Sequence, residues 1–317
     1  MNSDKCLVSV VIPVKNGERT IQRCLLSVLN QSNVNLKVFI VNDGSADSTL
    51  NIVKKIQKNH KNILIYNVKF NSSSLSRNFA ISKITTKYTA FIDADDVWHK
   101  EKIFLQLGCL SDKRSCGISF GSVITYDPSN EKYKKSIASN DLYSKDLIEN
   151  NKIALSTVLI KTRILKESHG FDFGRAEDYR LWVELSYKYK FCHVSNAVTL
   201  YEFSTNQKNS ETIVERMNTL LVFFSNQYQL SNISYCDYLN SISNIYYSSG
   251  AALSIFGGCS KSNYGKYMIE SLSYNFTMKK LSKVLAHLLL PRAIKYKLFF
   301  LTWSKFTGRD YFELLEL

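Results

Sequence analysis

Apolar runs and amphipathic stretches alternate regularly over the first third of the chain. The apolar runs lie at residues 7–13, 36–43, 62–67 and 88–96, and helical patterns lie between and after them, near 18–30, 46–59, 75–84 and 99–110. Such alternation is typical of parallel strands joined by helical crossovers. The sequence therefore predicts an α/β fold in which helices cover both faces of a largely parallel sheet, with its ligand site beyond the carboxyl ends of the strands.

Acids and amides stand at three of these strand ends. Asn16 follows the first strand and Asp43 follows the second, while Asp93, Asp95 and Asp96 end the fourth apolar run. Because the carboxyl ends of parallel strands meet at one edge of a sheet, we expect these side chains to converge.

The Asp93-Ala94-Asp95 sequence offers two carboxylates at one strand end. If the strand continues through it, alternate positions face the same way and aim two oxygen donors at one point, as a divalent cation bound to a diphosphate requires. A solvated turn, or a helix cap before Trp98, is an equally good interpretation of this short motif.

The Asp43-Gly44-Ser45 sequence also follows a strand and precedes a helix. Ser45 as the helix cap and Asp47 in the first turn would be purely structural, but Asp43 is less well explained by capping. A carboxylate at a strand end is able to hold a base or a ribose through hydrogen bonds.

Two further charged groups are candidates for the same edge. Arg77 opens the helix near 75–84 and could grip a diphosphate through two parallel bonds, although an arginine on a helix surface is common. Glu177 and Asp178 begin an amphipathic helix, where acids usually complement the helix dipole.

The rest of the chain predicts a mixed half and then helices. Strands are expected at 116–126, 154–160 and 191–203 and a helix at 177–190, whereas only helical patterns follow residue 205. We predict a first domain over residues 1–205, divided at residues 112 and 113, and a helical, basic region over 206–317.

Several classes of protein are excluded by missing patterns. The seven cysteines form no CxxC pair, and the five histidines have no HxxxH or HExxH spacing, so no zinc site is expected. Motifs of dinucleotide dehydrogenases, P-loop NTPases and α/β-hydrolases are also missing. Residues 1–12 lack the features of a secretion signal, and we expect reduced thiols in a cytoplasmic chain.

The positive charge of the chain is concentrated near its C-terminal end. The chain carries 41 Lys and Arg against 27 Asp and Glu, and residues 261–309 hold eight Lys and two Arg against Glu270 alone, interleaved with aromatic residues. This pattern favours a basic amphipathic surface at a membrane interface over a nucleic-acid site. The uncharged runs within 288–303 are too short to span a bilayer.

Five segments, in this order and spacing, closely resemble the family 2 glycosyltransferases, which have the GT-A fold. They are SVVIPVKNGERTIQRCLLSVLNQ, FIVNDGSADST, SLSRNFAI, YTAFIDADDVW and GFDFGRAEDYRLWVEL. Each segment is weak evidence alone, and the similarity covers about residues 7–203.

The resemblance implies a hexosyl-type transferase that inverts the anomeric carbon and uses a nucleoside-diphosphate sugar, by family habit UDP-linked, with Mn or Mg. The acceptor it implies is a hydroxyl of a glycan or of a polyprenyl-diphosphate-linked glycan, as in bacterial surface polysaccharide synthesis. Asp178 matches the catalytic base with Glu177 beside it, and Asp95 matches the metal ligand. The nucleotide-sugar contacts implied by the match are Pro13, Val14, Lys15, Asn16, Glu18, Asp43, Arg77, Asp93, Ala94 and Asp95.

The sequence departs from the family pattern at three places. Lys15 stands where an aromatic residue is usual, Ser72 and Ser76 stand where Gly and Ala are usual, and residues 201–204 hold no histidine after the closing strand. The third metal contact is therefore left unassigned.

Two other functions compete with this hypothesis. Residues 91–98 also resemble the strand end of haloacid-dehalogenase-type phosphatases, but the later acid pair then required to end a strand begins a predicted helix. A nucleotide-sugar- or lipid-binding module without catalysis is the second alternative, and the intact acid motifs count against it.

Overall fold

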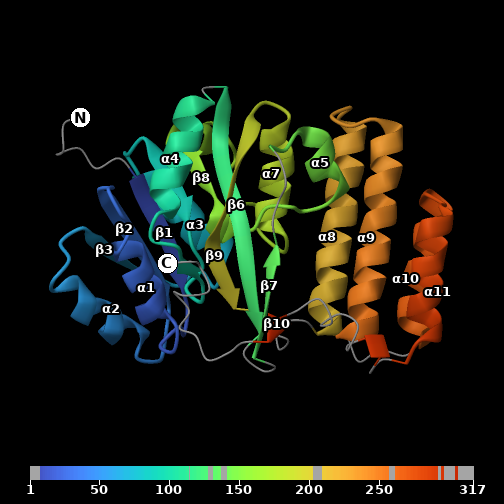
Figure 1. Cartoon of the computed structure of the whole chain (residues 1–317), viewed down its shortest axis with the longest axis horizontal. Helices are drawn as coiled ribbons and strands as arrows, with labels where there is room; N and C mark the ends of the chain where they lie inside the picture. The colour runs from blue at the N-terminus through green and yellow to red at the C-terminus, as the bar shows by residue number, and fades with distance from the viewer. Residues whose placement is uncertain are drawn as a thin grey trace.

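The computed structural model describes residues 8–113, 115–127, 131–136, 141–202, 209–256, 261–291, 294–295 and 304–305. A sheet with helices on both faces makes up one side of the molecule, and four longer helices stand beside it (Figure 1). The strands are β1 Val8–Val14, β2 Leu36–Asp43, β3 Ile63–Val68, β4 Tyr88–Phe91, β5 Val97–Trp98, β6 Cys116–Asp127, β7 Lys132–Ser136, β8 Leu159–Lys161, β9 Lys190–Glu202 and β10 Ser304–Lys305. The helices are α1 Ile21–Leu29, α2 Thr49–Gln57, α3 Ser73–Lys83, α4 Lys102–Asp112, α5 Ser144–Glu149, the 3₁₀ turn η1 Leu155–Thr157, α6 Thr162–Glu167, α7 Glu177–Ser186, α8 Ser210–Gln229, α9 Tyr235–Ile255, α10 Lys261–Tyr274 and α11 Met278–Leu289.

The sheet is parallel in its first part and mixed in its second. Its strands run in the order β10-β7-β6-β8-β4-β1-β2-β3, and β9 pairs with both β5 and β6. β1 is parallel to β2 and β4, and β2 is parallel to β3, whereas β8 runs antiparallel to β4 and β6. The predicted α/β fold, with a sheet that is parallel in its first part and mixed in its second, is confirmed.

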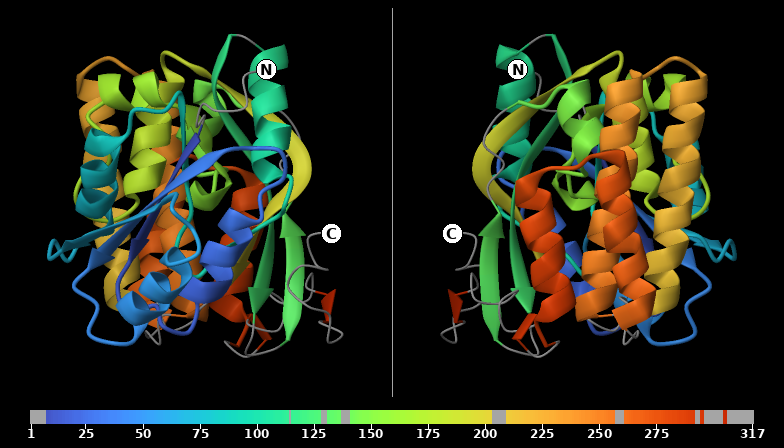
Figure 2. Two further views of the ribbon diagram at one scale, coloured as in Figure 1. Left: turned by 90° about the vertical axis from the view of Figure 1, so that its left-hand side faces the viewer. Right: turned by 90° about the vertical axis from the view of Figure 1, so that its right-hand side faces the viewer.

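Alternating side chains bury both faces of the central strands. Val10 and Ile12 of β1 belong to one apolar cluster, and Val11 between them belongs to another. In β2, Ile40 and Phe39 divide in the same way. Because successive strand residues face opposite sides, these nearly continuous apolar runs require helices on both faces. Figure 2 shows those helical layers.

The fourth strand is shorter than its apolar run. β4 ends at Phe91, and the acids lie in a turn that is closed by a hydrogen bond from Asp96 N to Asp93 O (3.0 Å). The predicted continuation of the strand through Asp93 and Asp95 is therefore wrong. The helix-cap alternative is wrong too, because Trp98 lies in β5 and the residue capping α4 is Glu101.

Two other local predictions also need correction. The expected strand at 154–160 divides into η1 and β8, since Thr157 N and Val158 N turn back to Ala154 O and Leu155 O. The cap of α2 is Ser48, not Ser45, whose hydroxyl is taken up by another loop.

The C-terminal region is helical where it is described, apart from β10. Its first two helices share one apolar core with the sheet, through residues such as Phe224 of α8 and Ile245 of α9. The predicted, mostly helical C-terminal region is thus confirmed, although β10, which returns to the sheet and pairs with β7, was not predicted. Within the described residues, none of the helices is long and apolar enough to cross a membrane. The expected domain boundary near 205 falls in a stretch, 203–208, outside the described residues and stays a prediction.

Candidate active site

Asp43, at the end of β2, organises the loop that precedes α3. Its Oδ1 accepts hydrogen bonds from Phe70 N (2.6 Å) and Asn71 N (3.0 Å), and its Oδ2 accepts from Ser72 N (2.8 Å). Only 4% of Asp43 is exposed. A carboxylate that gathers three backbone N–H groups fixes the shape of this loop at the sheet edge.

Asn16 and Glu18 connect the loop after β1 to the loop before α2. Asn16 has a positive φ of 52°, a conformation that asparagine tolerates better than most residues, and its Oδ1 accepts from Ala46 N (2.8 Å). Asn16 N donates to the Ser45 hydroxyl (2.9 Å), and Glu18 Oε2 accepts from Ser48 N (2.9 Å). The ends of β1, β2 and β3 are therefore joined into one edge by side chains that the motifs supply.

The acid turn, residues 93–96, carries three carboxylates in a small space. Burial and then the charge of Asp93 raise the pKa of Asp95 to about 6, and burial raises the pKa of Asp96 even more clearly. Only 1% of Asp96 is exposed. Such crowding favours binding of a positive charge at this turn, because a cation relieves the repulsion between the carboxylates.

Arg77 joins the acid turn to the start of α7. Its Nη2 lies 2.7 Å from Asp93 Oδ1 and its Nη1 lies 2.8 Å from Glu177 Oε1. Burial lowers its pKa, but the two carboxylates outweigh that effect and raise it. The alternative of an arginine on the helix surface is wrong, because Arg77 is only 4% exposed and both terminal nitrogens hold a carboxylate.

Asp178 lies next to Glu177 at the start of α7. The residue before the pair, Ala176, has a positive φ of 56°, and this bend starts the helix at Glu177. Asp178 Oδ1 accepts from Tyr179 N (2.7 Å). Burial, and then the neighbouring charge of Glu177, raise the pKa of Asp178 to about 6, so it is a stronger base than an ordinary carboxylate and still ionised at neutral pH.

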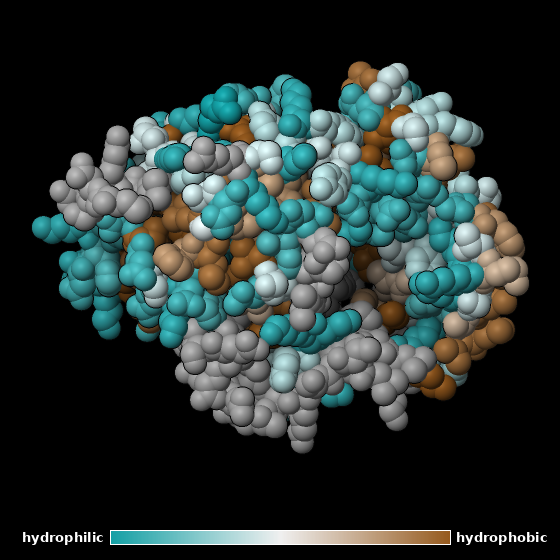
Figure 3. All heavy atoms as spheres, turned by 45° about the horizontal axis from the view of Figure 1, so that its top comes forward, coloured by the Kyte–Doolittle hydropathy of each residue, from teal (hydrophilic) through white to brown (hydrophobic). Residues whose placement is uncertain are grey.

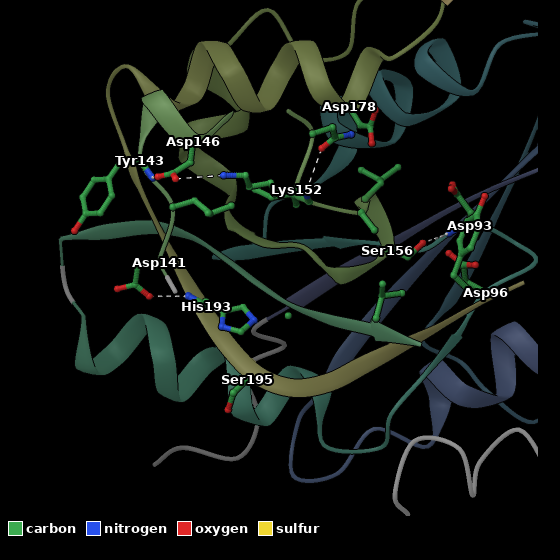
Figure 4. A pocket seen from close by; sticks show the side chains of 18 of the residues that line it. Asp93, Asp96, Asp141, Tyr143, Asp146, Lys152, Ser156, Asp178, His193 and Ser195 are labelled. Carbon is green, nitrogen blue, oxygen red and sulfur yellow. Dashed lines mark hydrogen bonds and ion pairs between the residues drawn. The ribbon is translucent and has the colours of Figure 1, made fainter. Parts of the chain in front are cut away.

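Two clefts open on this edge and meet at Asp93 and Tyr201. The first cleft, of about 1320 Å³, is lined by Glu177 and by the ten residues predicted to contact the nucleotide sugar: Pro13, Val14, Lys15, Asn16, Glu18, Asp43, Arg77, Asp93, Ala94 and Asp95. The second cleft, of about 1370 Å³, lies among β6, β9, η1 and the loop around α5, and it contains Asp178 (Figure 4). Glu177 and Asp178 are adjacent in the sequence, but Glu177 lines the first cleft and Asp178 lines the second.

The far end of the second cleft is lined by opposite charges. Lys113 lies 2.7 Å from Asp141, and Lys152 lies 3.3 Å from Asp146, as Figure 4 shows for the second pair. His193 and Tyr143 complete this end. None of these side chains stood in a recognisable motif. His193 comes from β9, Lys113 from the end of α4, and the others from the chain between β7 and η1.

An ion pair at the end of β9 was also missed. Arg23 of α1 contacts Glu202, and its Nη2 donates to Asp95 O (3.1 Å). Glu202 stands in the stretch where a family histidine was sought, and its charge helps to raise the pKa of Asp95. The position of Arg23 within a predicted helix gave no reason to expect this contact. Phe203 and Ser204 lie outside the described residues.

Comparisons with known proteins bear on the first half of the chain most directly. The sequence model described as Glycosyl transferase family 2 matches residues 9–170. The Escherichia coli protein named UDP-Glc:alpha-D-GlcNAc-diphosphoundecaprenol beta-1,3-glucosyltransferase WfgD is 28% identical over 182 residues, which are 57% of this chain and 70% of that protein.

Two solved structures resemble the whole arrangement. Residues 1–349 of S. aureus TarS, in complex with UDP, give a TM-score of 0.62 at 16% identity, over 92% of this chain and 89% of that one. The mannosyltransferase PcManGT from Pyrobaculum calidifontis, in complex with GDP-Man and Mn2+, gives a TM-score of 0.56 at 14% identity, over 92% of this chain and 86% of that one.

Proposed function

The chain belongs to glycosyl transferase family 2 and is a glycosyltransferase with the GT-A fold, and from this premise we propose an inverting, metal-dependent transfer of a sugar from a UDP-sugar. One observation carries the proposal. Arg77 ties together Asp93 and Glu177 where the two clefts meet. A donor in the first cleft and an acceptor in the second would place their reacting atoms at this junction.

The first cleft suits a nucleoside diphosphate. Asp43, Asn16 and Pro13 line it and would contact the base and ribose, and the acid turn, which also lines it, would lie near the diphosphate. Polar groups at the carboxyl ends of parallel strands are where α/β proteins bind nucleotides. The complex of TarS with UDP supports UDP as the nucleotide.

Asp95 fits the role of a metal ligand. Hard carboxylate oxygens are what Mg²⁺ and Mn²⁺ prefer, and a nucleotide-bound Mg²⁺ usually takes only one or two of them from the protein. Among the described residues, no group of three His, Cys, Asp or Glu is arranged to hold a metal, so diphosphate and water would complete the ligand set. A bound metal would stabilise the negative charge that develops on the departing diphosphate. The complex of PcManGT with Mn2+ supports this choice.

Asp178 fits the role of general base. It would take the proton of the acceptor hydroxyl while the hydroxyl oxygen bonds to the anomeric carbon, and the bond from that carbon to the phosphate oxygen breaks. The nucleoside diphosphate leaves with the bonding electrons. A single displacement without an enzyme nucleophile inverts the anomeric centre.

The acceptor we propose is a hydroxyl of a glycan or of a polyprenyl-diphosphate-linked glycan. The second cleft is large and carries charged groups such as Lys152 and Asp146 beside apolar ones, a lining that could bind the hydroxyls and the ring faces of a sugar chain. The name of WfgD, which acts on a diphosphoundecaprenol-linked sugar, supports the lipid-linked form. The enzyme would then work in the cytoplasm, at the inner face of the cell membrane.

Release of nucleoside diphosphate tests the proposal. UDP-, GDP- and dTDP-sugars are supplied with and without Mn²⁺ to the wild type and to Asp95→Ala, in the presence of a glycan and a lipid-linked acceptor. We expect metal-dependent turnover of the UDP-sugar that is lost in the variant. Nucleotide binding without turnover would support the binding-module alternative instead.

The outer face of α11 supports contact with the membrane. Met278, Leu285 and Leu289, spaced by seven and four residues, form one stripe and are 72%, 43% and 72% exposed. Figure 3 shows apolar surface at the right-hand edge, where the C-terminal helices lie. Exposed Lys279 and Lys283 are on the same helix.

The positive charge around this apolar stripe of α11 indicates what the stripe binds. Residues 261–291 hold five Lys against Glu270, so a second copy of the same face would be repelled and an anionic lipid surface attracted. We therefore propose that α11 docks on anionic lipid. The remaining basic segment up to residue 309 lies largely outside the described residues.

Sedimentation with vesicles tests this docking. The wild type should bind vesicles containing phosphatidylglycerol and not pure phosphatidylcholine. At about 1 kcal/mol per basic residue, losing two lysines in K279A/K283A should lower the partition about 30-fold. L285S/L289S should also weaken binding, whereas Val222→Ser, which removes a 61% exposed valine of α8, should not. A dimer that the stripe variants dissociate would contradict the assignment.

A further inference from the structure

Lys102, on α4 beneath the acid turn, is a wholly buried lysine. It is 0% exposed, and its Nζ donates to Gln106 Oε1 (2.6 Å) and lies 3.5 Å from Val158 O. The same nitrogen lies 4.2 Å from the centre of the Trp98 ring. No acid pairs with it in the part of the chain that the structure describes, and burial holds its pKa well below the usual value. Burial of this kind disfavours the charged form of the amine.

The contacts of Lys102 continue into η1. Gln106, also 0% exposed, donates from Nε2 to Thr157 O (2.7 Å) and to Ser119 O (3.1 Å). The Trp98 indole donates to Ser156 O (2.7 Å). Three consecutive carbonyls, of residues 156, 157 and 158, are thus held by side chains of β5 and α4.

On its other side η1 presents one hydroxyl to the acid turn. Ser156 Oγ accepts a hydrogen bond from Asp93 N (3.0 Å) and also contacts the carboxyl group of Asp96. Ser156 therefore touches both the first and the last residue of this turn. Asp95, the proposed metal ligand, lies between these two contacts.

Burial alone does not account for this arrangement. Apolar side chains of similar size would fill the space beneath the acid turn without the cost of burying an amine and an amide. The polar groups instead donate hydrogen bonds to the buried backbone carbonyls of a short turn, of which Ser156 O also accepts from Thr199 Oγ1 (3.1 Å). The buried side chains of Lys102 and Gln106 are thus linked, through η1 and the Ser156 hydroxyl, to the acid turn.

We propose that Lys102, Gln106 and Ser156 are positioning residues for the reaction: the first two fix η1, and the Ser156 hydroxyl fixes the backbone that aims Asp95. The inference rests on the proposed function in that Asp95 is taken to serve the metal and the diphosphate. Displacing that carboxylate by a fraction of an ångström would weaken the coupling between metal and nucleotide.

Ser156→Ala is the decisive variant, because it removes one hydroxyl and leaves the fold intact. Its matched control is Ser9→Ala, a buried serine on β1 whose hydroxyl bonds to Thr86 (2.8 Å) at the opposite end of the strand. We expect Ser156→Ala to lower UDP affinity in the presence of Mn²⁺ about tenfold, equal to about 1.4 kcal/mol, and to change affinity without metal little. The control should keep both affinities.

Amide hydrogen exchange over residues 92–98 supplies a readout that needs no nucleotide. Exchange there should accelerate in Ser156→Ala and in Lys102→Met, and not in Ser9→Ala. If wild-type UDP binding proves independent of metal, the proposed function fails while the exchange data still decide the positioning role. Unchanged exchange in Ser156→Ala, with a loss of thermal stability like that of the control, would overturn the inference.

Discussion

The two clefts that meet at Asp93 are built in different ways. In the first, strand-end side chains are bound to one another and to backbone N–H groups, as Asp43 is to residues 70–72 and Arg77 is to two carboxylates. In the second, the far end is lined by exposed side-chain pairs such as Lys113 and Asp141. The first cleft is thus held by buried contacts among its own groups, whereas the far end of the second relies on more exposed pairs.

This difference matches the two substrates we propose. A nucleoside diphosphate is common to many transferases and is held well by a preformed edge, because preorganised groups cost little to order on binding. The acceptor distinguishes one enzyme from another, and a cleft with exposed, flexible side chains accommodates such variation.

The largest effect on activity is expected at Asp178, which lines the second cleft. Asp178→Asn should lower kcat by about 10²–10⁴-fold, the usual cost of losing a general base, with little change in UDP affinity. Steady-state kinetics and calorimetric titration with UDP check both parts. Asp146→Asn, farther along the same cleft, is the control and should keep kcat within a few-fold. Equal losses in the two variants would remove Asp178 from the role of base.

Arg77 should show the next largest effect, and on stability as well as on activity. Arg77→Met leaves Asp93 and Glu177 without their partner, and breaking a fully buried pair costs about 3–5 kcal/mol. Because the Asp93 side chain is 37% exposed, we expect a smaller loss, on the order of 2 kcal/mol. Urea unfolding measures it. An unchanged midpoint would show that the first cleft is not held through Arg77.

The pH dependence of kcat and of UDP affinity should distinguish the two clefts further. The pKa of Asp178 is raised to about 6, and a base is lost when it takes up a proton, so kcat should fall about tenfold per pH unit below that value. The pKa of Asp95 is also raised to about 6, so UDP affinity with metal should weaken over the same range. In Asp178→Asn, kcat should no longer fall as the pH drops below about 6, whereas UDP affinity should still weaken over that range.

Lys102 predicts that stability, like kcat, depends on pH. Burial lowers its pKa in the folded state, so the unfolded chain binds more protons between the folded and the unfolded value, and stability rises with pH through that window. The slope contributed by one proton is at most about 1.4 kcal/mol per pH unit. Thermal unfolding between pH 7 and 10 in wild type and Lys102→Met measures it. A slope that is identical in both proteins would show that Lys102 stays charged.

The first cleft is the part of the site that the sequence predicted best. Its residues belong to contiguous segments that end strands, and the apolar runs of β1, β2 and β4 place those ends at one edge. The shape of the acid turn was not predictable, because Ser156, 63 residues from Asp93 along the chain, sets it. The burial of Arg77 likewise depends on Glu177, 100 residues away.

The second cleft depends on long-range pairing that no local pattern reveals. β9 pairs with β6 through a register interrupted by irregularities, between Gly121 and Ser122 among other places, and this pairing decides which side chains face the cleft. α5, which supplies Asp146 to the cleft lining, was not predicted, and neither was β7. The return of β10 to the sheet was equally invisible, since two residues carry no periodicity.

The smallest effect is expected at the far end of the second cleft. Lys113→Ala removes one partner of an ion pair whose side chains are 47% and 32% exposed. Exposed pairs of this kind contribute about 0.2–1 kcal/mol, so the free energy of unfolding should change by less than about 1 kcal/mol. Urea unfolding checks this, with Lys100→Ala, another exposed lysine, as the control. If Lys113→Ala destabilises the protein as much as Arg77→Met does, the far end of the second cleft is as firmly built as the first cleft, and the contrast between a preset donor side and an adjustable acceptor side fails.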